Sequence, residues 1–353
     1  MTFSLSASQI QNFMAASIEF HMRGEVAKQS IQDKHLLKML EAGSKPFPGG
    51  KDKKITYRVK GDYVGAEEGY EGDDQVSYYN PSEIREASII WYERHIGLTC
   101  TGTELKMAGI TVTESDVKYT MKDQKQAAAT RLANIWDDKM EDMTESRSRS
   151  RERMFWADGS ASTKDVPGVK YWIVDNPTVP LVVAGLDQGA NTWWRNRARL
   201  GIVANLANAA SQVLVDTLQF EYRQLTRYGD KPTTLLCGSA FIEQLERELR
   251  ARGQYTQTGW SDTGTLDVSM GDVNFKGMRA QYEPHLDDIG ESKRGYWLNI
   301  GANGLCQMHM DGELDKSHAP ARDPKEYVIY MARTSTLAMK CRRRNHMGVY
   351  SIA

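Results

Sequence analysis

The sequence predicts a soluble α+β protein in which long projecting segments are joined to a mixed body of helices and strands. Three observations support this fold class. Residues 54–105 read as a long β-hairpin, residues 115–157 read as one long helix, and strand and helix patterns mix from about residue 165 onward. Hydrophobic residues make up 40% and charged residues 26% of the 353-residue chain, a balance typical of globular proteins.

The first fifty residues form an expected N-terminal arm. Ser6 and Gln9 make a capping-box pattern before apolar residues at helical spacing. Ser30 is the expected cap of a second short helix that ends at Gly43. Because these two helices carry too few apolar residues to form a core of their own, we expect the arm to dock on another surface.

The expected hairpin consists of two β-rich runs and an acidic connection. KKITYRVKGDYV alternates apolar and polar residues, and EASIIWYERHIGLTCTGTEL supplies the return run. Between them, GAEEGYEGDDQVSYYNPSE is rich in acidic residues and glycine. A lone hairpin is marginally stable in water, so we expect this one to project and to lie on a neighbouring molecule.

Two long helical patterns organise the rest of the chain. Apolar side chains recur on one face of residues 115–157, and Gly159 provides a stop signal. Residues 198–228 show a second apolar face and are expected to form a second long helix. The segments from KPTTLLCGS to the C-terminus read as strands, turns and one further helix.

Composition and motifs argue against several classes of function. The formal net charge is −1, so the chain lacks the overall basic excess that gripping duplex DNA requires. The four cysteines are far apart and are expected to be reduced and buried. The chain contains no P-loop, HExxH, GxSxG, EF-hand or dinucleotide-binding pattern. We therefore predict no catalytic residue, no cofactor and no metal site, and no segment is apolar enough to span a membrane.

Two arginine-rich segments are candidates for contact with a polyanion. The alternation in SRSRSRER does not give one continuous basic face on a helix, and Glu145 pairs favourably with Arg149, so a solvated helix face is the alternative. KCRRRNH is denser and reads as a strand, where contact with DNA, contact with a partner carboxylate and simple solubility all stay open. The candidate DNA-facing residues are Arg147, Arg149, Arg151, Arg153, Arg342 and Arg344.

The segment VAGLDQGANTWWRNRA places Trp193 and Trp194 among several arginines. A nucleic-acid stacking platform, a sugar or ligand site and a packing anchor all use tryptophan. Stacking needs rings presented on an open groove among basic residues, whereas a large buried anchor is the commoner use. The position of the pair in one loop favours the anchor.

The order of these elements resembles that of the major capsid proteins of tailed bacteriophages, whose Hong Kong phage fold is shared with encapsulins. That order is N-terminal arm, extended loop, long spine helix, and then peripheral and axial domains. Six strings in the right order carry the resemblance over nearly the whole chain. They are EASIIWYERHIGLTCTGTELKMAG, MFWADGSAS, GLDQGANTWWRN, VNFKGMRAQYEP, YWLNIGANGL and KEYVIYMARTSTLAMKC.

The resemblance implies an arm at 1–53, an extended loop at 54–110, a peripheral domain with the spine helix at 111–190, an axial domain at 191–325 and closing strands of both domains at 326–353. It implies a structural, non-enzymatic function. Hexamers and pentamers would close into an icosahedral shell around packaged double-stranded DNA. Such a protein would be made in the host cytoplasm and located in the virion.

The implied partners are other copies of the chain, separate scaffolding, decoration and portal proteins, and packaged DNA through weak non-specific contact. Two alternatives stay open: an encapsulin-type compartment shell and a soluble enzyme of unknown activity. The residues expected at subunit interfaces are Arg58, Lys60, Tyr63, Tyr70, Tyr78, Tyr79, Trp91, Trp193, Trp194, Arg195 and Arg197.

Overall fold

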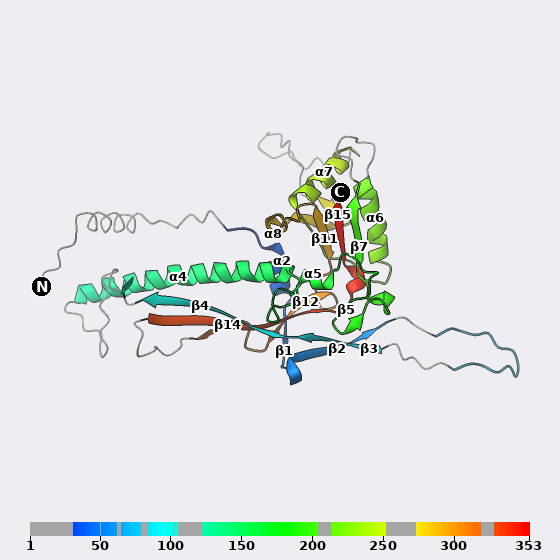
Figure 1. The fold of residues 1–353 in the computed structure, drawn as a ribbon, viewed down its shortest axis with the longest axis horizontal. Helices are drawn as coiled ribbons and strands as arrows, with labels where there is room; N and C mark the ends of the chain where they lie inside the picture. The colour runs from blue at the N-terminus through cyan, green and yellow to red at the C-terminus, as the bar shows by residue number, and fades with distance from the viewer. Residues whose placement is uncertain are drawn as a thin grey trace, which may run out of the picture. The chain divides into compact units, whose positions relative to one another are not determined.

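The computed structural model describes residues 31–49, 51–61, 65–78, 84–101, 103–104, 122–203, 213–251, 273–318 and 328–353 (Figure 1). The chain divides into two units, Met1–Asp33 and Lys34–Ala353, and every element named below lies in the second. The first helix expected in the arm lies outside the described residues.

A five-stranded sheet is organised around β14, whose sequence VIYMARTSTLAMKC is rich in β-forming residues. β14 pairs antiparallel with β4 from Val328 opposite Thr101 to Leu337 opposite Tyr92. It also pairs with β12 and β13, and β12 pairs in parallel with β1. The strands are β1 (Lys45–Phe47), β4 (Tyr92–Thr101), β12 (Leu305–Met310), β13 (Lys316–His318) and β14 (Val328–Cys341).

The long helix α4 (Lys122–Trp156) packs against this sheet through β4. Its 35 residues correspond to a length of about 52 Å. Met154, Phe155 and Trp156 at its end are buried in the main core, beside the short helix α5 (Val169–Trp172). The helix expected at 115–157 is therefore confirmed over 122–156, and residues 105–121 lie outside the described part.

The second arm helix, α2 (His35–Ala42), docks on α4, as expected for a helix without its own core. Its buried face belongs to the same core as the end of α4. The helix ends at Gly43 as predicted, but it begins at His35 and not after Ser30. The reason is tertiary: the Glu152 carboxylate of α4 accepts a hydrogen bond from the Leu37 backbone N–H at 2.9 Å and supplies the missing cap.

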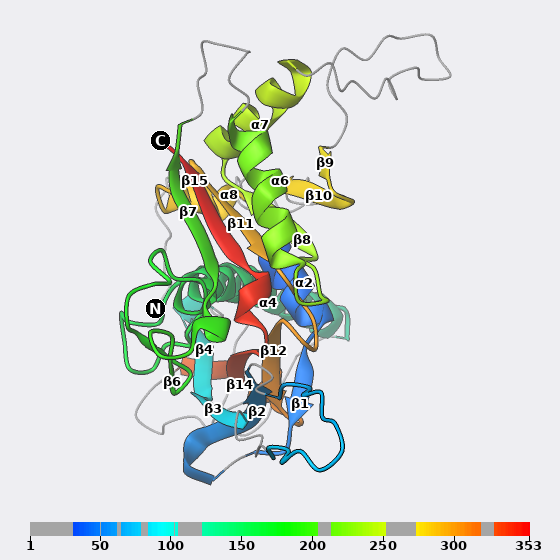
Figure 2. The same ribbon diagram turned by 90° about the vertical axis from the view of Figure 1, so that its right-hand side faces the viewer.

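A six-stranded sheet forms a second layered region, with the order β7-β15-β11-β8-β10-β9. Helices α6 (Val213–Leu225) and α7 (Ser239–Ala251) pack against it around a separate apolar core that includes Trp297 (Figure 2). The short helix α8 (Pro284–Asp288) follows β10. The strands are β7 (Arg197–Ile202), β8 (Thr234–Cys237), β9 (Asn274–Phe275), β10 (Met278–Tyr282), β11 (Arg294–Leu298) and β15 (Gly348–Ile352).

The prediction of a long helix over residues 198–228 is wrong for the first residues of that range. Residues 197–202 form β7, which pairs in parallel with β15. Leu200, which helical spacing assigned to the buried face, is exposed. The pairing with β15 near the C-terminus decides the conformation here, and a distant partner is invisible to local periodicity. The helical part that remains is α6, with Leu214, Leu218 and Leu225 buried as expected.

The hairpin is shorter than expected. β2 (Lys54–Lys60) pairs antiparallel with β3 (Ile84–Ile90), but the rest of the return run leaves at Trp91 and becomes β4 of the five-stranded sheet. The five-stranded sheet also contains β1 of the expected arm and β12 and β13 of the expected axial range. The expected domain boundaries stay a prediction.

Candidate subunit interface

The base of the hairpin is fixed to the body by its inward-facing side chains. Tyr57, Val59, Ala87 and Ile89 are buried in the main core. The Tyr57 hydroxyl donates a hydrogen bond to the Cys341 carbonyl at 2.7 Å, and the Lys340 ammonium lies 4.9 Å from the centre of the Tyr57 ring. Burial raises the pKa of Tyr57 far above its usual value, so this hydroxyl is a permanent donor. These two contacts join the base of the hairpin to the end of β14 in the five-stranded sheet.

On the outer face of the same strand, Arg58 and Lys60 are exposed. Their alternation with Tyr57 and Val59 is the period-2 pattern that the sequence predicts for a strand with one buried face. Both residues therefore lie where a neighbouring molecule can contact them, and their role at a subunit interface stays a prediction.

The segment VAGLDQGANTWWRNRA, which contains Trp193 and Trp194, is called the tryptophan loop, and it forms a hydrogen bond with the hairpin. A two-residue turn at Ala184 and Gly185, with φ of 53° and 81°, joins β5 (Val182–Val183) to β6 (Leu186–Asp187). This is the positive-φ geometry of a tight hairpin turn. The Ala184 carbonyl accepts a hydrogen bond from the Ser88 N–H of β3 at 2.9 Å. This hydrogen bond connects β3 of the hairpin to the tryptophan loop.

Trp193 and Trp194 act as anchors within one chain. Trp194 is only 1% exposed, and its indole N–H donates to the Val183 carbonyl at 3.2 Å. Trp193 is half-buried and lies against Gly61 at the end of β2, where a Cβ atom would come within 2.6 Å of the ring. The two rings meet edge to face at 5.9 Å. The expectation that Trp194 lies at a subunit interface is wrong, because its own chain already covers it.

Arg344 is buried beside the tryptophan loop and forms hydrogen bonds with several of its residues. It is fully buried, and its Nε and Nη1 groups donate to the Trp172 and Trp194 carbonyls at 2.7 and 3.1 Å. Its Nη2 group contacts the side-chain oxygens of Gln188 and Asn196 at 3.3 and 3.2 Å. Burial lowers the pKa of this guanidinium to about 10. The prediction that Arg344 faces DNA is therefore wrong.

The neighbouring arginines of the loop are also engaged inside the chain. Arg197 forms a bidentate ion pair with buried Glu221 at 2.8 and 3.0 Å. Arg195 instead donates to the Gln188 and Gly189 carbonyls at 2.8 and 2.9 Å. Both contacts hold the loop in shape, and any contact of these two residues with a neighbour stays a prediction.

Substitution of Trp193 by Ala tests the anchor. Because the ring is half-buried, we expect a loss of about 1.5–2.5 kcal/mol, half of what a fully buried tryptophan costs. Thermal unfolding measures this loss, and faster proteolysis within residues 65–78 would show that the hairpin base has loosened. The variant Trp193→Phe, which keeps a ring over Gly61, should lose less than half as much.

The described tip of the hairpin, residues 65–78, is exposed throughout and is called the acidic tip below. Two of the expected interface residues lie there, Tyr70 at 71% and Tyr78 at 93% exposure. In Figure 1 the acidic tip extends from β2 and β3 on the side away from α4. Tyr63 and Tyr79, two further expected contacts, lie outside the described residues. Large aromatic side chains this exposed are typical of a surface that a partner covers.

Trp91 is less accessible than expected for an interface residue. It is half-buried against the core, with Phe47 at 6.4 Å and the Lys53 ammonium at 5.1 Å from its ring. Its position between β3 and β4 explains this environment, because the chain changes sheets there.

The arginines expected to face DNA divide into two groups. Arg149, Arg153 and Arg342 are exposed, so their expected contact with DNA stays a prediction. The other two arginines form ion pairs within the chain. Arg147 pairs with Asp315 at 2.5 Å, and Arg151 pairs with Glu41 at 3.0 Å. Arg151 is buried, so its expected contact with DNA is wrong.

The described residues also bear on chemistry and membranes. All four cysteines are buried thiols, as predicted. Among the described residues, no group of three or more His, Cys, Asp or Glu side chains is placed to hold a metal ion. No helix in the described part of the chain is long and apolar enough to cross a bilayer.

Comparison with solved structures identifies the fold. The chain matches the capsid of cyanophage A-1(L) with a TM-score of 0.57 at 13% identity, over 93% of this chain and 94% of that one. It matches the mature capsid of bacteriophage PhiM1 with a TM-score of 0.57 at 7% identity, over 94% and 91% of the two chains. The capsid of Myoviridae phage XM1 matches over 100% of both chains, with a TM-score of 0.52 at 10% identity.

The arrangement of arm, extended hairpin, long helix and two sheets is thus the Hong Kong phage capsid fold of tailed-phage major capsid proteins. No protein-family model matches the chain, and no curated protein matches it in sequence. The likeness therefore lies in the fold and extends over nearly the whole chain.

Proposed function

We propose that the chain is the structural major capsid protein of a tailed phage, and that its copies assemble as hexamers and pentamers into an icosahedral shell around packaged double-stranded DNA. The observation that carries this proposal is the match to phage capsid structures over 93% of the chain with a TM-score of 0.57. Nothing in this role requires catalysis. The shell would be part of the virion, and separate scaffolding, decoration and portal proteins would complete it.

The surface of the described residues supports the proposal. The acidic tip is exposed, carries aromatic side chains and makes its described contacts within itself. A segment that buries nothing in its own chain gains stability only when another molecule covers it. The formal net charge of −1 suits a wall that contains DNA without gripping it. Exposed Arg149, Arg153 and Arg342 would supply the weak contacts with DNA.

Electron microscopy of particles purified from producing cells tests this function. Closed shells that hold double-stranded DNA and carry tail vertices are the expected result. Shells that hold a protein cargo and no DNA would instead favour an encapsulin-type compartment. A protein that stays a monodisperse monomer at every concentration would rule out both kinds of shell and leave the enzyme alternative.

Replacing residues 65–78 with a short Gly-Ser turn tests the hairpin separately. Since these residues are exposed in the subunit, we expect the melting temperature of the subunit to change little. We expect the yield of closed shells to fall by about tenfold or more, because the contact between neighbours is lost. Sedimentation velocity and electron microscopy measure the yield, and shells formed at normal yield would contradict an interface role for the tip.

A further inference from the structure

Two buried carboxyl groups lie against the first turn of α2. Glu152 reaches this turn from α4, and one of its oxygens accepts the hydrogen bond from the Leu37 N–H at 2.9 Å. Glu283 reaches it from the residue before α8, and the backbone N–H groups of His35 and Leu36 favour the charged form of its carboxylate. Glu152 is only 3% exposed, and Glu283 is fully buried. Two acids from distant parts of the chain therefore contact the start of the arm helix.

These two carboxyl groups disfavour each other's ionisation. Burial penalises a carboxylate, and the negative charge of Glu152 adds to this penalty for Glu283. The N–H groups of α2 favour the charged forms, but burial outweighs them. The pKa of Glu152 is raised to about 7 and that of Glu283 to about 8, from an ordinary value of 4.5. The docked position of α2 therefore stabilises the protonated pair.

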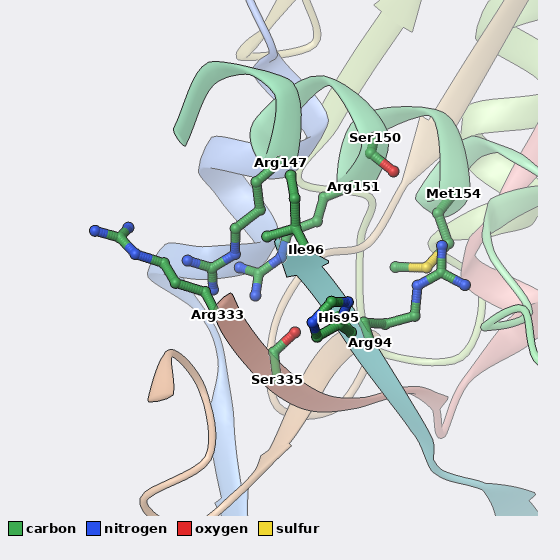
Figure 3. A pocket seen from close by; sticks show the side chains of 9 residues that line it. All are labelled: Arg94, His95, Ile96, Arg147, Ser150, Arg151, Met154, Arg333 and Ser335. Carbon is green, nitrogen blue, oxygen red and sulfur yellow. The ribbon is translucent and has the colours of Figure 1, made fainter. Parts of the chain in front are cut away.

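Two ion pairs also join α2 to α4. Lys34, just before α2, pairs with Glu145 at 2.6 Å, and Glu41 in the last turn of α2 pairs with Arg151 at 3.0 Å. Figure 3 shows Arg151 leaving α4 on the same side as Arg147. Lys34 favours the charged form of Glu152 and Glu41 opposes it. Both ion pairs are retained in every variant tested below.

Two histidines lie at the same end of α2. His285 follows Glu283 closely, and burial lowers the pKa of its imidazole, so the ring is neutral where Glu283 titrates. His35 is the first residue of α2 and is a further titratable group. A pH response that depended on His35 would survive substitution of Glu283. The other charges that act on His285 are those of Asp288, Arg153, Lys170 and Glu291.

α2 is the element that can move to relieve the burial of these charges. Glu152 lies one turn before the end of α4, where Phe155 and Trp156 are buried in the main core. The Glu283 N–H donates to the Cys237 carbonyl of the six-stranded sheet at 2.9 Å. In contrast, α2 has 8 residues, packs on α4 and β12, and is followed by β1, a three-residue strand at the edge of its sheet. Local opening of such a peripheral helix costs less free energy than unfolding of the whole subunit.

We propose that Glu152 and Glu283 form a proton-dependent latch for the arm helix. α2 docks on α4 while the two carboxyl groups hold their protons, and it detaches at alkaline pH, when both are ionised. Because residues 1–33 precede α2, the latch controls whether the N-terminal arm is attached to the long helix. This property belongs to the single subunit and does not rest on the proposed shell function.

Hydrogen exchange of the α2 amides in the unassembled, full-length subunit tests the latch. The docked state holds protons that the detached state releases, so docking is strongest below pH 4.5 and weakens as the pH rises toward 8. We expect the protection of His35–Ala42, corrected for the intrinsic exchange rate, to fall by about tenfold or more between pH 7 and pH 9. α6, which packs in the other core, should keep its protection.

Two results with the wild type would overturn this inference. Unchanged protection of α2 would show that its docking does not depend on the two carboxyl groups. An equal loss of protection in α2 and α6 would show that the rise in pH destabilises the whole subunit and does not release the arm helix.

Glu283→Gln assigns the response to the carboxyl pair. The amide cannot ionise, so we expect the protection of α2 in this variant to change by less than about threefold between pH 7 and pH 9. Asp288→Asn removes an exposed acid from the same short helix, α8, and should follow the wild type. A tenfold fall that persists in folded Glu283→Gln would assign the response to another group and overturn the latch. If Glu283→Gln does not fold, the comparison of α2 with α6 in the wild type decides the outcome.

Discussion

Arg344→Ala is expected to destabilise the subunit by about 3–5 kcal/mol, because it removes a fully buried, hydrogen-bonded charge. The guanidinium is fully buried and donates to four acceptors, the carbonyls of Trp172 and Trp194 and the side-chain oxygens of Gln188 and Asn196. Alanine would leave all four acceptors without this donor and would open a void beside Trp194. Chemical denaturation of the purified subunit measures the loss.

Two matched variants show what Arg344 contributes. Arg343→Ala removes the neighbouring arginine, which is exposed and pairs with Asp230 at 3.6 Å, and it should cost less than about 0.5 kcal/mol. Arg344→Lys keeps the charge but cannot reach the four acceptors with one ammonium group, so it should remain strongly destabilised. An Arg344→Ala subunit as stable as the wild type would show that the junction does not depend on this network.

Local patterns in the sequence were sufficient for the parts of the fold that depend on local order. The alternation of Tyr57 and Val59 predicts β2, the periodic face of α4 predicts a long helix, and Gly43 marks the end of α2. These signals depend on residues within a few positions of one another. The order of such elements also carries the resemblance to phage capsid proteins, which the fold confirms.

Pairing between distant segments explains what the sequence did not reveal. The β7 segment has helical spacing, but β15 near the C-terminus draws it into a sheet. In KCRRRNH, alternation assigned Arg342 and Arg344 to one strand face, yet β14 ends at Cys341 and a 3-10 turn (Arg344–His346) begins three residues later. As a result, the Arg344 side chain is buried, whereas the Arg342 side chain is exposed. A run of charges therefore did not distinguish a surface residue from a buried one.

A pair of buried carboxylates was missed for the same reason. Glu152 on α4 and Glu283 just before α8 lie far apart in the sequence, and neither belongs to a recognisable motif. Glu152 accepts hydrogen bonds from the Leu37 N–H and the Trp156 indole N–H at 2.9 and 2.7 Å. Glu283 is fully buried, and its burial together with the nearby charge of Glu152 outweighs the favourable effect of the backbone N–H groups of His35, Leu36 and His285 on its carboxylate. The environment of Glu283 therefore penalises its charged form.

The stability of the subunit should consequently fall as the pH rises. Burial raises the pKa of Glu152 to about 7, and burial together with the charge of Glu152 raises the pKa of Glu283 to about 8, against an ordinary value of 4.5. Between pH 4.5 and these raised pKa values, the folded subunit keeps carboxyl protons that the unfolded chain has already released. The free energy of unfolding therefore decreases by up to about 1.4 kcal/mol per pH unit for each carboxyl group. The contribution is complete below pH 4.5 and is lost as the pH passes about 8.

Glu283→Gln should remove most of this dependence. The amide has nearly the same shape as the protonated acid and cannot ionise, so the variant should match the wild type below pH 4.5. At pH 9 we expect it to be more stable than the wild type by about 2–4 kcal/mol, because the wild type must then bury a charge or unfold. Denaturation curves at several pH values measure the difference. Glu243→Gln, which changes an exposed carboxyl on α7, should follow the wild type throughout. Parallel pH curves for Glu283→Gln and wild type would contradict a buried, proton-holding Glu283.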